Sequence, residues 1–240
     1  MWVLALDTTT KDGSVALVRD GAVVIERAGD PAWSHAERLP ADLRAVLAEA
    51  GLGPGHLDLI AVATGPGAFT GLRIGLAAAQ GLALALDRPA VGVSTLTAIA
   101  WAVLHERPSL TAAGAWLDAT RGEVYAAMFA RPAHGHDVPL VPVFEATSLS
   151  PADTLTLWNR FAAAGLTVGV AAGPAVLEAC RGGGAEPVPA PALLAGIVGR
   201  LGASLHAQGR SGSPAALAPE YVRRPDVEIA RDRRRDTAPA

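Results

Sequence analysis

The stretch TGPGAFTGLRIG, residues 64–75, places four glycines and a proline between an apolar run and a helix-like run. Glycine-rich turns between a strand and a helix often cradle phosphate groups. A P-loop requires a lysine after its last glycine, but Leu72 follows Gly71 and no lysine is near. A dinucleotide fingerprint requires G-x-G-x-x-G, and here Gly65, Gly67 and Gly71 are spaced one residue too widely. The spacing therefore meets neither phosphate-binding pattern.

Two aspartates, Asp7 and Asp118, each end an apolar strand-like run and precede a small polar turn. The two segments, ALDTTTKDGSVALV and WLDATRGEVYAAMF, share the same order of strand, Leu-Asp, turn, glycine and alternating strand. This shared plan predicts an internal repeat, in which two related domains face a cleft. The alternative is a chance likeness between two hairpins.

Other residue types that often carry chemistry are scattered. His134 and His136 lie in a loop flanked by proline and glycine, and two imidazoles alone rarely make a metal site, so a solvated loop is the preferred interpretation. Ser34 beside His35 is better explained as a helix cap than as part of a nucleophilic triad. Cys180 is the single cysteine, which excludes an internal disulfide and favours a reducing compartment.

The composition favours a globular cytoplasmic protein. Half of the 240 residues are apolar, which is ample for a buried core, and the length allows one large domain or two small ones. The net charge of −3 gives no indication of a nucleic-acid or membrane surface. The start, MWVLALDTTT, is not expected to act as a signal peptide, and the apolar run 82–86 is too short to span a bilayer.

Hydrophobic periodicity predicts the elements that would position these residues. In the first half we expect a buried strand in MWVLALD, a hairpin turning at Asp20-Gly21, and a helix in 34–50 that opens with a capping box of Ser34 and Glu37. Pro40 would bend or restart that helix. The segment LDLIAVATG is a further strand, GLRIGLAAAQGLALAL a helix, and PAVGVSTLTAIAWAVL a short strand and a third helix.

The second half begins with a strand, turn and strand in AAGAWLDATRGEVYAAMFARP. A proline-rich passage at 131–151, in which we expect one or two short strands, comes next. The helix PADTLTLWNRFAAAG, the strand LTVGVAAG and the helix PALLAGIVGRLGASLHAQG follow it. A pause at HERPS predicts a domain boundary there. We therefore expect domains at 1–105 and 106–225 and a disordered charged tail at 226–240.

The helix that follows the glycine-rich stretch is apolar over most of its circumference, so it must be covered on more than one side. Its small-residue face holds Gly71, Gly75, Ala78 and Leu82, and Arg73 and Gln80 form a thin polar stripe opposite. Small residues at this spacing would let a second helix approach closely. Two interpretations remain open at this point, a helix central to its own domain and an association surface.

Several motifs, in order and spacing, resemble the bacterial TsaB family, also called YeaZ. They are LALDTTTKDGSVALV, SHAERLPADL, GPGAFTGLRIGLAAAQGLA, VSTLTAIA and LDATRGEVY, and they cover residues 1–127. Beyond Phe129 the resemblance is looser. It implies an α/β fold of the ASKHA (actin, Hsp70 and sugar kinase) type, with two related lobes of which the second is reduced.

The resemblance also implies a role in making N6-threonylcarbamoyladenosine at position 37 of tRNA. In that pathway this subunit is not the catalyst. It pairs with the catalytic, metal-containing paralogue TsaD, or with a second copy of itself, and the ATPase TsaE joins the assembly. We therefore expect no metal or cofactor of its own, ATP and Mg²⁺ at the level of the complex, contact with tRNA through the complex, and no membrane partner.

The family's association surface is a helical bundle made by the two helices at 34–50 and 71–86. Its expected residues here are Leu39, Leu43, Val46, Gly71, Ile74, Gly75, Ala78 and Leu82. The catalytic paralogue presents a His-x-x-x-His pair on a helix, and none of the six histidines here has that spacing. This absence disfavours the interpretation of the chain as the catalytic paralogue itself.

The alternative function is an ASKHA-type ATPase or phosphotransferase. Asp7 and Asp118 stand where such enzymes place carboxylates around Mg²⁺ and phosphate. However, DTTT lacks the glycine that lets the backbone approach phosphate closely, so we interpret both aspartates as vestigial turn residues. The tail interleaves arginines with acids, and we expect it to be solvated rather than to contact RNA strongly.

Overall fold

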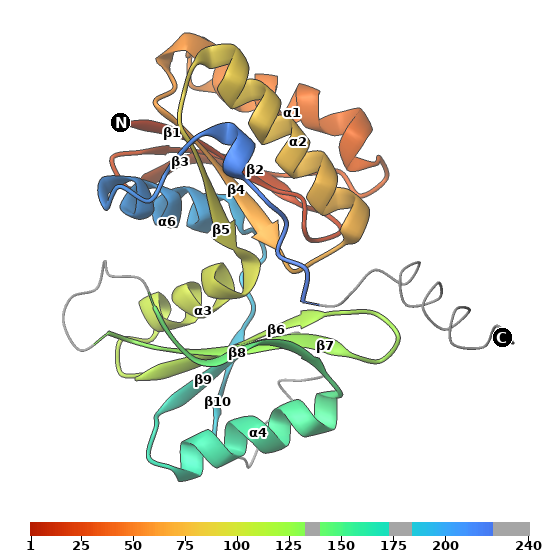
Figure 1. Ribbon diagram of the computed structural model, residues 1–240, viewed down its shortest axis with the longest axis vertical. Helices are drawn as coiled ribbons and strands as arrows, with labels where there is room; N and C mark the ends of the chain where they lie inside the picture. Colours follow the sequence, from red (N-terminus) through yellow and green to blue (C-terminus); the bar gives the residue numbers. More distant parts are fainter. Residues whose placement is uncertain (133–139, 173–183, 223–240) are drawn as a thin grey trace, which may run out of the picture.

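The computed structural model describes residues 1–132, 140–172 and 184–222. The strands of the first and second halves form two separate five-stranded sheets, one above the other in Figure 1. His134, His136, Cys180 and the tail at 226–240 lie outside the described residues, so the predictions made for them stay predictions.

The first sheet has the strand order β3-β2-β1-β4-β5. Its strands are β1 (Trp2–Asp7), β2 (Ser14–Arg19), β3 (Ala22–Ala28), β4 (Leu59–Gly65) and β5 (Ala90–Ser94). The first three are antiparallel neighbours, and β1, β4 and β5 are parallel. The predicted hairpin turn is confirmed, because Asp20 and Gly21 both have the positive φ angles, 50° and 80°, that a tight two-residue turn requires.

The second sheet repeats this arrangement strand for strand, in the order β8-β7-β6-β9-β10. Its strands are β6 (Ala112–Asp118), β7 (Val124–Ala130), β8 (Val141–Leu149), β9 (Val168–Ala172) and β10 (Glu186–Pro189). The sequence analysis missed β10, because a four-residue edge strand with two prolines lacks a strand pattern. The predicted internal repeat is confirmed, because the two sheets share one strand order, and the two related units give the two-lobed ASKHA fold.

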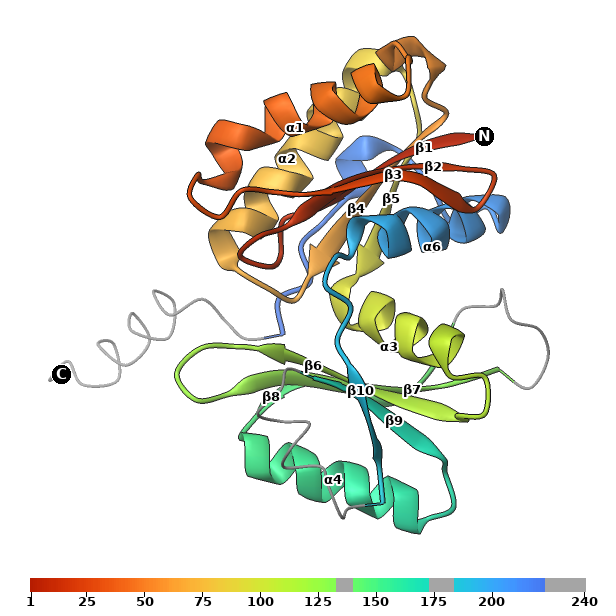
Figure 2. The same cartoon turned by 180° about the vertical axis from the view of Figure 1, so that it is seen from behind.

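Helices form the remaining layers, as Figures 1 and 2 show. They are α1 (His35–Glu49), α2 (Phe69–Leu86), α3 (Thr95–Glu106), α4 (Pro151–Ala163) and α6 (Ala195–Ala207), with short 3₁₀ turns η1 (Pro54–His56) and η2 (Pro214–Ala216). α1 and α2 lie side by side on the outer face of the first sheet, and α4 covers the outer face of the second. α3 and α6 lie between the two sheets and contact each other.

The two inner helices are exchanged between the lobes. α3 follows the first sheet but packs on β6, β7 and β9, whereas α6 follows the second sheet and packs on β1, β2 and β4. The start of α6 is held there by hydrogen bonds, because Ser14 Oγ accepts from Ala195 N at 2.9 Å and Glu26 Oε1 accepts from Gly196 N at 2.8 Å. A division at residues 105 and 106 therefore separates the strands of the lobes but not the helices that pack on them.

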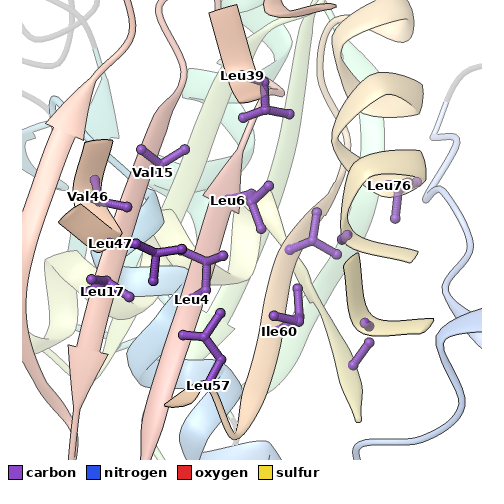
Figure 3. Packing of buried hydrophobic residues seen from close by; sticks show 14 of the residues in the cluster. Leu4, Leu6, Val15, Leu17, Leu39, Val46, Leu47, Leu57, Ile60 and Leu76 are labelled. Carbon is purple, nitrogen blue, oxygen red and sulfur yellow. The ribbon is translucent and has the colours of Figure 1, made fainter. Parts of the chain in front are cut away.

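The central strands of the first sheet, β1, β2 and β4, are buried on both faces, whereas the edge strand β3 is largely exposed. Leu4 and Leu6 point toward α1 and α2, and Figure 3 shows them beside Leu47 and Ile60. Val3, Ala5, Ala16 and Ala61 point the other way, toward α6. Each fully buried leucine contributes about 1.5–3 kcal/mol relative to an exposed one, so this double-sided core accounts for much of the stability of the lobe.

α1 begins where the sequence predicts. Ser34 accepts a hydrogen bond from the backbone N of Glu37, and the Glu37 side chain accepts one from Ser34 N, which completes the capping box. Pro40 lies inside the helix, which continues through it to Glu49. The expected restart at Pro40 therefore does not occur, although the proline removes the backbone donor that would bond to Ala36 O.

A half-buried histidine ties the start of α1 to the turn between β1 and β2. His35 Nε2 donates to Thr10 O at 3.1 Å, and His35 Nδ1 accepts from Arg38 Nη2 at 2.8 Å. Arg38 is itself nearly buried, pairs with Asp42 at 2.7 Å and donates to Asp12 O. Burial, together with the Arg38 guanidinium, lowers the pKa of His35, so the folded protein favours its neutral form.

α2 is the one described helix that is long and apolar enough, by length and composition, to cross a membrane. A third of its 18 residues are buried, and it packs on β4 and α1. Its apolar character is therefore shared between the core of the first lobe and an outward face.

The close approach of α6 to the first sheet generates a stability prediction. A Cβ at Gly199 would lie 2.6 Å from Val18 Cγ2, so Gly199→Ala should destabilise the protein by about 1–3 kcal/mol through overpacking. Gly81 on α2 has open space around it, and Gly81→Ala should instead stabilise by about 0.5–1 kcal/mol. Urea unfolding of both variants checks this, and equal effects would contradict the packing of α6.

The lowered pKa of His35 predicts how the free energy of unfolding depends on pH. An unfolded histidine titrates near about pH 6.5, and the folded pKa of His35 is lower, so the unfolded chain binds more protons in the interval between the two. The free energy of unfolding should therefore fall as the pH decreases below about 6.5. Urea unfolding at pH 7.5 and 5.5 should show a smaller loss for His35→Gln, whose amide can still donate to Thr10 O. An equal loss in both proteins would exclude His35 as the source.

Candidate functional site

The first candidate carboxylate, Asp7, accepts three hydrogen bonds from its own turn. Its Oδ1 accepts from Thr9 N at 2.9 Å and from Thr9 Oγ1 at 2.5 Å, and its Oδ2 accepts from Thr10 Oγ1 at 3.1 Å. The side chain is 1% exposed. Burial raises the pKa of Asp7, and the bonds from Thr9 and Thr10 partly offset that rise. These contacts occupy the oxygens that a metal–phosphate group would need.

The second candidate, Asp118, has the same local role in the second lobe. Its Oδ1 accepts from Thr120 N at 2.8 Å, two residues on, as Asp7 accepts from Thr9 N. The β1–β2 and β6–β7 hairpins correspond in register, with Asp7 opposite Ser14 and Asp118 opposite Val124. Asp118 is exposed, and no hydrogen bond or ion pair between described residues joins the two aspartates. Each one therefore closes a turn.

The glycine-rich loop packs on the β1–β2 turn of the same chain. Ala68 N, just before α2, donates to Thr9 O at 2.8 Å, and Thr8 Oγ1 donates to Gly71 O at 2.8 Å. A Cβ at Gly67 would lie 2.5 Å from Thr9 Cβ. The backbone of residues 8–9 thus lies against the start of α2, where a bound phosphate would otherwise lie.

Two of the glycines expected to face a partner point inward instead. A Cβ at Gly71 would lie 2.2 Å from Thr8 O, and one at Gly75 would lie 2.1 Å from Thr8 Oγ1. Both glycines are buried. The expectation that they present an open small-residue face is therefore wrong, because their missing side chains let α2 approach the β1–β2 turn.

The other expected interface residues divide into two sets. Leu39 and Val46 of α1 are buried in the core of the first lobe. The partly buried set packs against that core and reaches the surface of α1 and α2, and it consists of Leu43, Ile74, Ala78 and Leu82.

The outward surface of α2 is a single row of residues at i, i+4 spacing, which the sequence analysis missed. The row consists of Phe69, Arg73, Ala77, Gly81 and Ala85, all exposed, and Leu84 lies beside it with 65% exposure. α1 exposes a parallel row of small residues and one arginine, Ala36, Pro40, Arg44 and Ala48. The i, i+4 spacing was visible in the sequence. It could not be singled out, because α2 is apolar on nearly every side.

These outward rows have the character of a helix-packing surface. Rows at i, i+4 form the ridges that interdigitate when helices pack, and small residues allow close approach. Each row carries one charge, on Arg44 or Arg73.

Neither a metal-ligating cluster nor a strongly polar cavity was found among the described residues. In the described parts of the chain, no three His, Cys, Asp or Glu side chains gather to hold a metal ion. A cavity of about 320 Å³ beside α3 is lined mainly by apolar residues, together with His105 and Arg131. Arg131 donates to Leu104 O and, at 3.3 Å, to Leu110 O, so it ties the end of α3 to the second sheet.

Comparisons with known proteins fit this geometry. A family model described as TsaD, tRNA N6-adenosine threonylcarbamoyltransferase, matches residues 30–147, a region that includes α1 and α2. The tRNA N6-adenosine threonylcarbamoyltransferase of Thermus thermophilus is 40% identical over 119 residues, which cover 42% of this chain and 37% of that protein. The region that the family model matches runs from just before α1 into β8 and leaves out β1, β2 and β3.

The tRNA threonylcarbamoyladenosine biosynthesis protein TsaB of Escherichia coli is 38% identical over 135 residues, or 56% of this chain. The match spans a little over half, 58%, of that curated relative. The solved structure of YeaZ from Pseudomonas aeruginosa superposes with a TM-score of 0.73 and 30% identity. That superposition covers 92% of this chain and 99% of the other. Because the likeness extends over nearly the whole of both chains, this chain belongs to the TsaB family, also called YeaZ.

Proposed function

We propose that this chain is the non-catalytic subunit of a tRNA threonylcarbamoyltransferase complex, in which it docks on a catalytic TsaD-type paralogue. The observation that carries the proposal is the outward row of α2, which includes Ala77 and Gly81 and has Leu84 beside it, together with the exposed row of α1. Both helices lie within the region that is similar to the transferase family. Two chains with the same first lobe can pair these helices as the halves of a pseudo-symmetric interface.

The turn geometry supports a non-catalytic role. A subunit that transfers phosphate or a carbamoyl group needs a group free to touch the reacting atoms. Here the oxygens of Asp7 are engaged by Thr9 and Thr10, and the first turn of α2 is covered by Thr8 and Thr9. The side chains and backbone that could hold a nucleotide in this lobe instead hold the lobe together.

The remaining partners follow from the same proposal. ATP and Mg²⁺ act at the level of the complex, through a TsaE-type ATPase, and tRNA is engaged by the assembled complex in the cytoplasm. The product is N6-threonylcarbamoyladenosine at position 37. A homodimer through the same helices is the competing assembly.

The outward row gives the first test. Ala77→Arg places a long charged side chain between the packed helices, so it should weaken the complex with the TsaD-type subunit at least about a hundredfold. Ala77 is exposed, and the fold should survive. Ala163→Arg, at the exposed end of α4 in the second lobe, is the matched control and should bind normally. Size-exclusion chromatography and titration calorimetry measure both, and normal binding by Ala77→Arg would remove this face from the interface.

The second test concerns chemistry. Supplied with threonylcarbamoyl-adenylate and tRNA, the purified chain alone should not modify the tRNA, whereas the reconstituted complex should. Calorimetry of the isolated chain with Mg–ATP should show no micromolar binding. Micromolar binding with turnover that is lost in Asp7→Ala would instead support an ATPase or phosphotransferase, and modification by the chain alone would refute the non-catalytic role.

A further inference from the structure

Three side chains at the start of α2 form a preassembled cluster. The rings of Phe69 and Tyr221 stack with their centroids 5.5 Å apart. The Arg73 guanidinium lies 3.9 Å from the Phe69 centroid, and its Nε donates to the Tyr221 hydroxyl at 3.0 Å. Phe69 is 40% exposed and Tyr221 is 41% exposed. The cluster therefore joins residues 148 positions apart and still presents both rings to the surface.

A strap of chain, residues 212–222, holds Tyr221 in place. It starts at Gly212, which pairs with Ala90 at the edge of the first sheet. Gln80 Nε2 then donates to Leu217 O at 3.1 Å, and Glu220 N donates to Thr64 O at 2.7 Å. The polar stripe of α2, Arg73 and Gln80, is thus used to fasten this strap. Each end of the strap is anchored, so Tyr221 has a fixed position beside Phe69.

We propose that Phe69, Arg73 and Tyr221 are the binding hot spot of the docking surface, and that their partner is the TsaD-type paralogue. This rests on the proposed function and names the residues that carry its affinity. Hot spots are enriched in Tyr, Trp and Arg, and they lose little entropy on binding when their side chains are already ordered. The cluster meets both conditions, because stacking and a hydrogen bond fix all three side chains.

The position of the cluster supports this partner. Phe69 and Arg73 are the first two members of the row that continues through Ala77, Gly81 and Ala85. One helix laid along that row would reach the small residues and the cluster together. The partner must supply an apolar recess for the two rings and an oxygen acceptor for the Nη atoms of Arg73. The region of similarity to the transferase includes both α1 and α2, so a paralogue with the same first lobe has helices of the required form.

The test is titration calorimetry of the full-length chain with the purified TsaD-type subunit. Tyr221→Ala and Arg73→Ala should each weaken binding by about tenfold or more, while Tyr221→Phe, which keeps the ring stack, should weaken it less. The midpoint of thermal unfolding should change little, since these side chains lie at the surface. Val141→Ala, at an exposed position on β8, is the control and should bind as the unmodified chain does.

The outcomes separate this inference from the proposed function. If the unmodified chain binds the paralogue, Ala77→Arg does not, and the cluster variants bind within about twofold of normal, the hot spot is refuted and the docking surface stands. If the unmodified chain does not bind the paralogue, both the docking surface and the hot spot are refuted.

Two further results would also overturn the inference. A loss of tRNA affinity with normal paralogue binding would assign the cluster to RNA. A loss of self-association alone would assign it to a second copy of this chain. If Tyr221→Ala unfolds, Arg73→Ala and Tyr221→Phe decide the question.

Discussion

The close packing of the glycine-rich loop on the turn between β1 and β2 is the constraint on which the rest of the first lobe depends. Gly67, Gly71 and Gly75 each lack the Cβ that would collide with Thr8 or Thr9. The hydrogen bonds from Ala68 N to Thr9 O and from Thr8 Oγ1 to Gly71 O then fix where α2 begins. His35 adds α1 to the same junction by donating to Thr10 O. The packing at this turn thereby fixes the positions of both α1 and α2. It also fixes which of their faces is exposed to solvent.

The same packing covers the backbone at the start of α2 with residues of the chain itself. In this lobe, the turn that would approach a nucleotide binds the chain's own carboxylate and covers the start of α2. Asp118 closes the equivalent turn of the second lobe through the same bond to the residue two positions on. Duplication has kept the local geometry of the two hairpins, although one aspartate is buried and the other exposed.

The exchange of α3 and α6 makes the two lobes interdependent. Each inner helix completes the core of the other half, and Ser14 and Glu26 hold the start of α6 against the first sheet. With the inner face of the first sheet covered in this way, α1 and α2 are left as the outer layer. The C-terminal strap then covers one flank of α2, so that the row from Phe69 to Ala85, with Leu84 beside it, remains open.

The sequence by itself determined the strands of the first sheet, the hairpin at Asp20-Gly21, the capping box at Ser34, the internal repeat and the family, because these depend on local chemistry and on spacing along the chain. Only the tertiary structure decided which face of α2 is open. A helix that is apolar all round gives no periodic signal, and the partners of Gly71, Gly75, Arg73 and Gln80 lie about 60 to 150 residues away in the chain. The same holds for Tyr221, whose role depends on a ring and a guanidinium that no local pattern could place beside it.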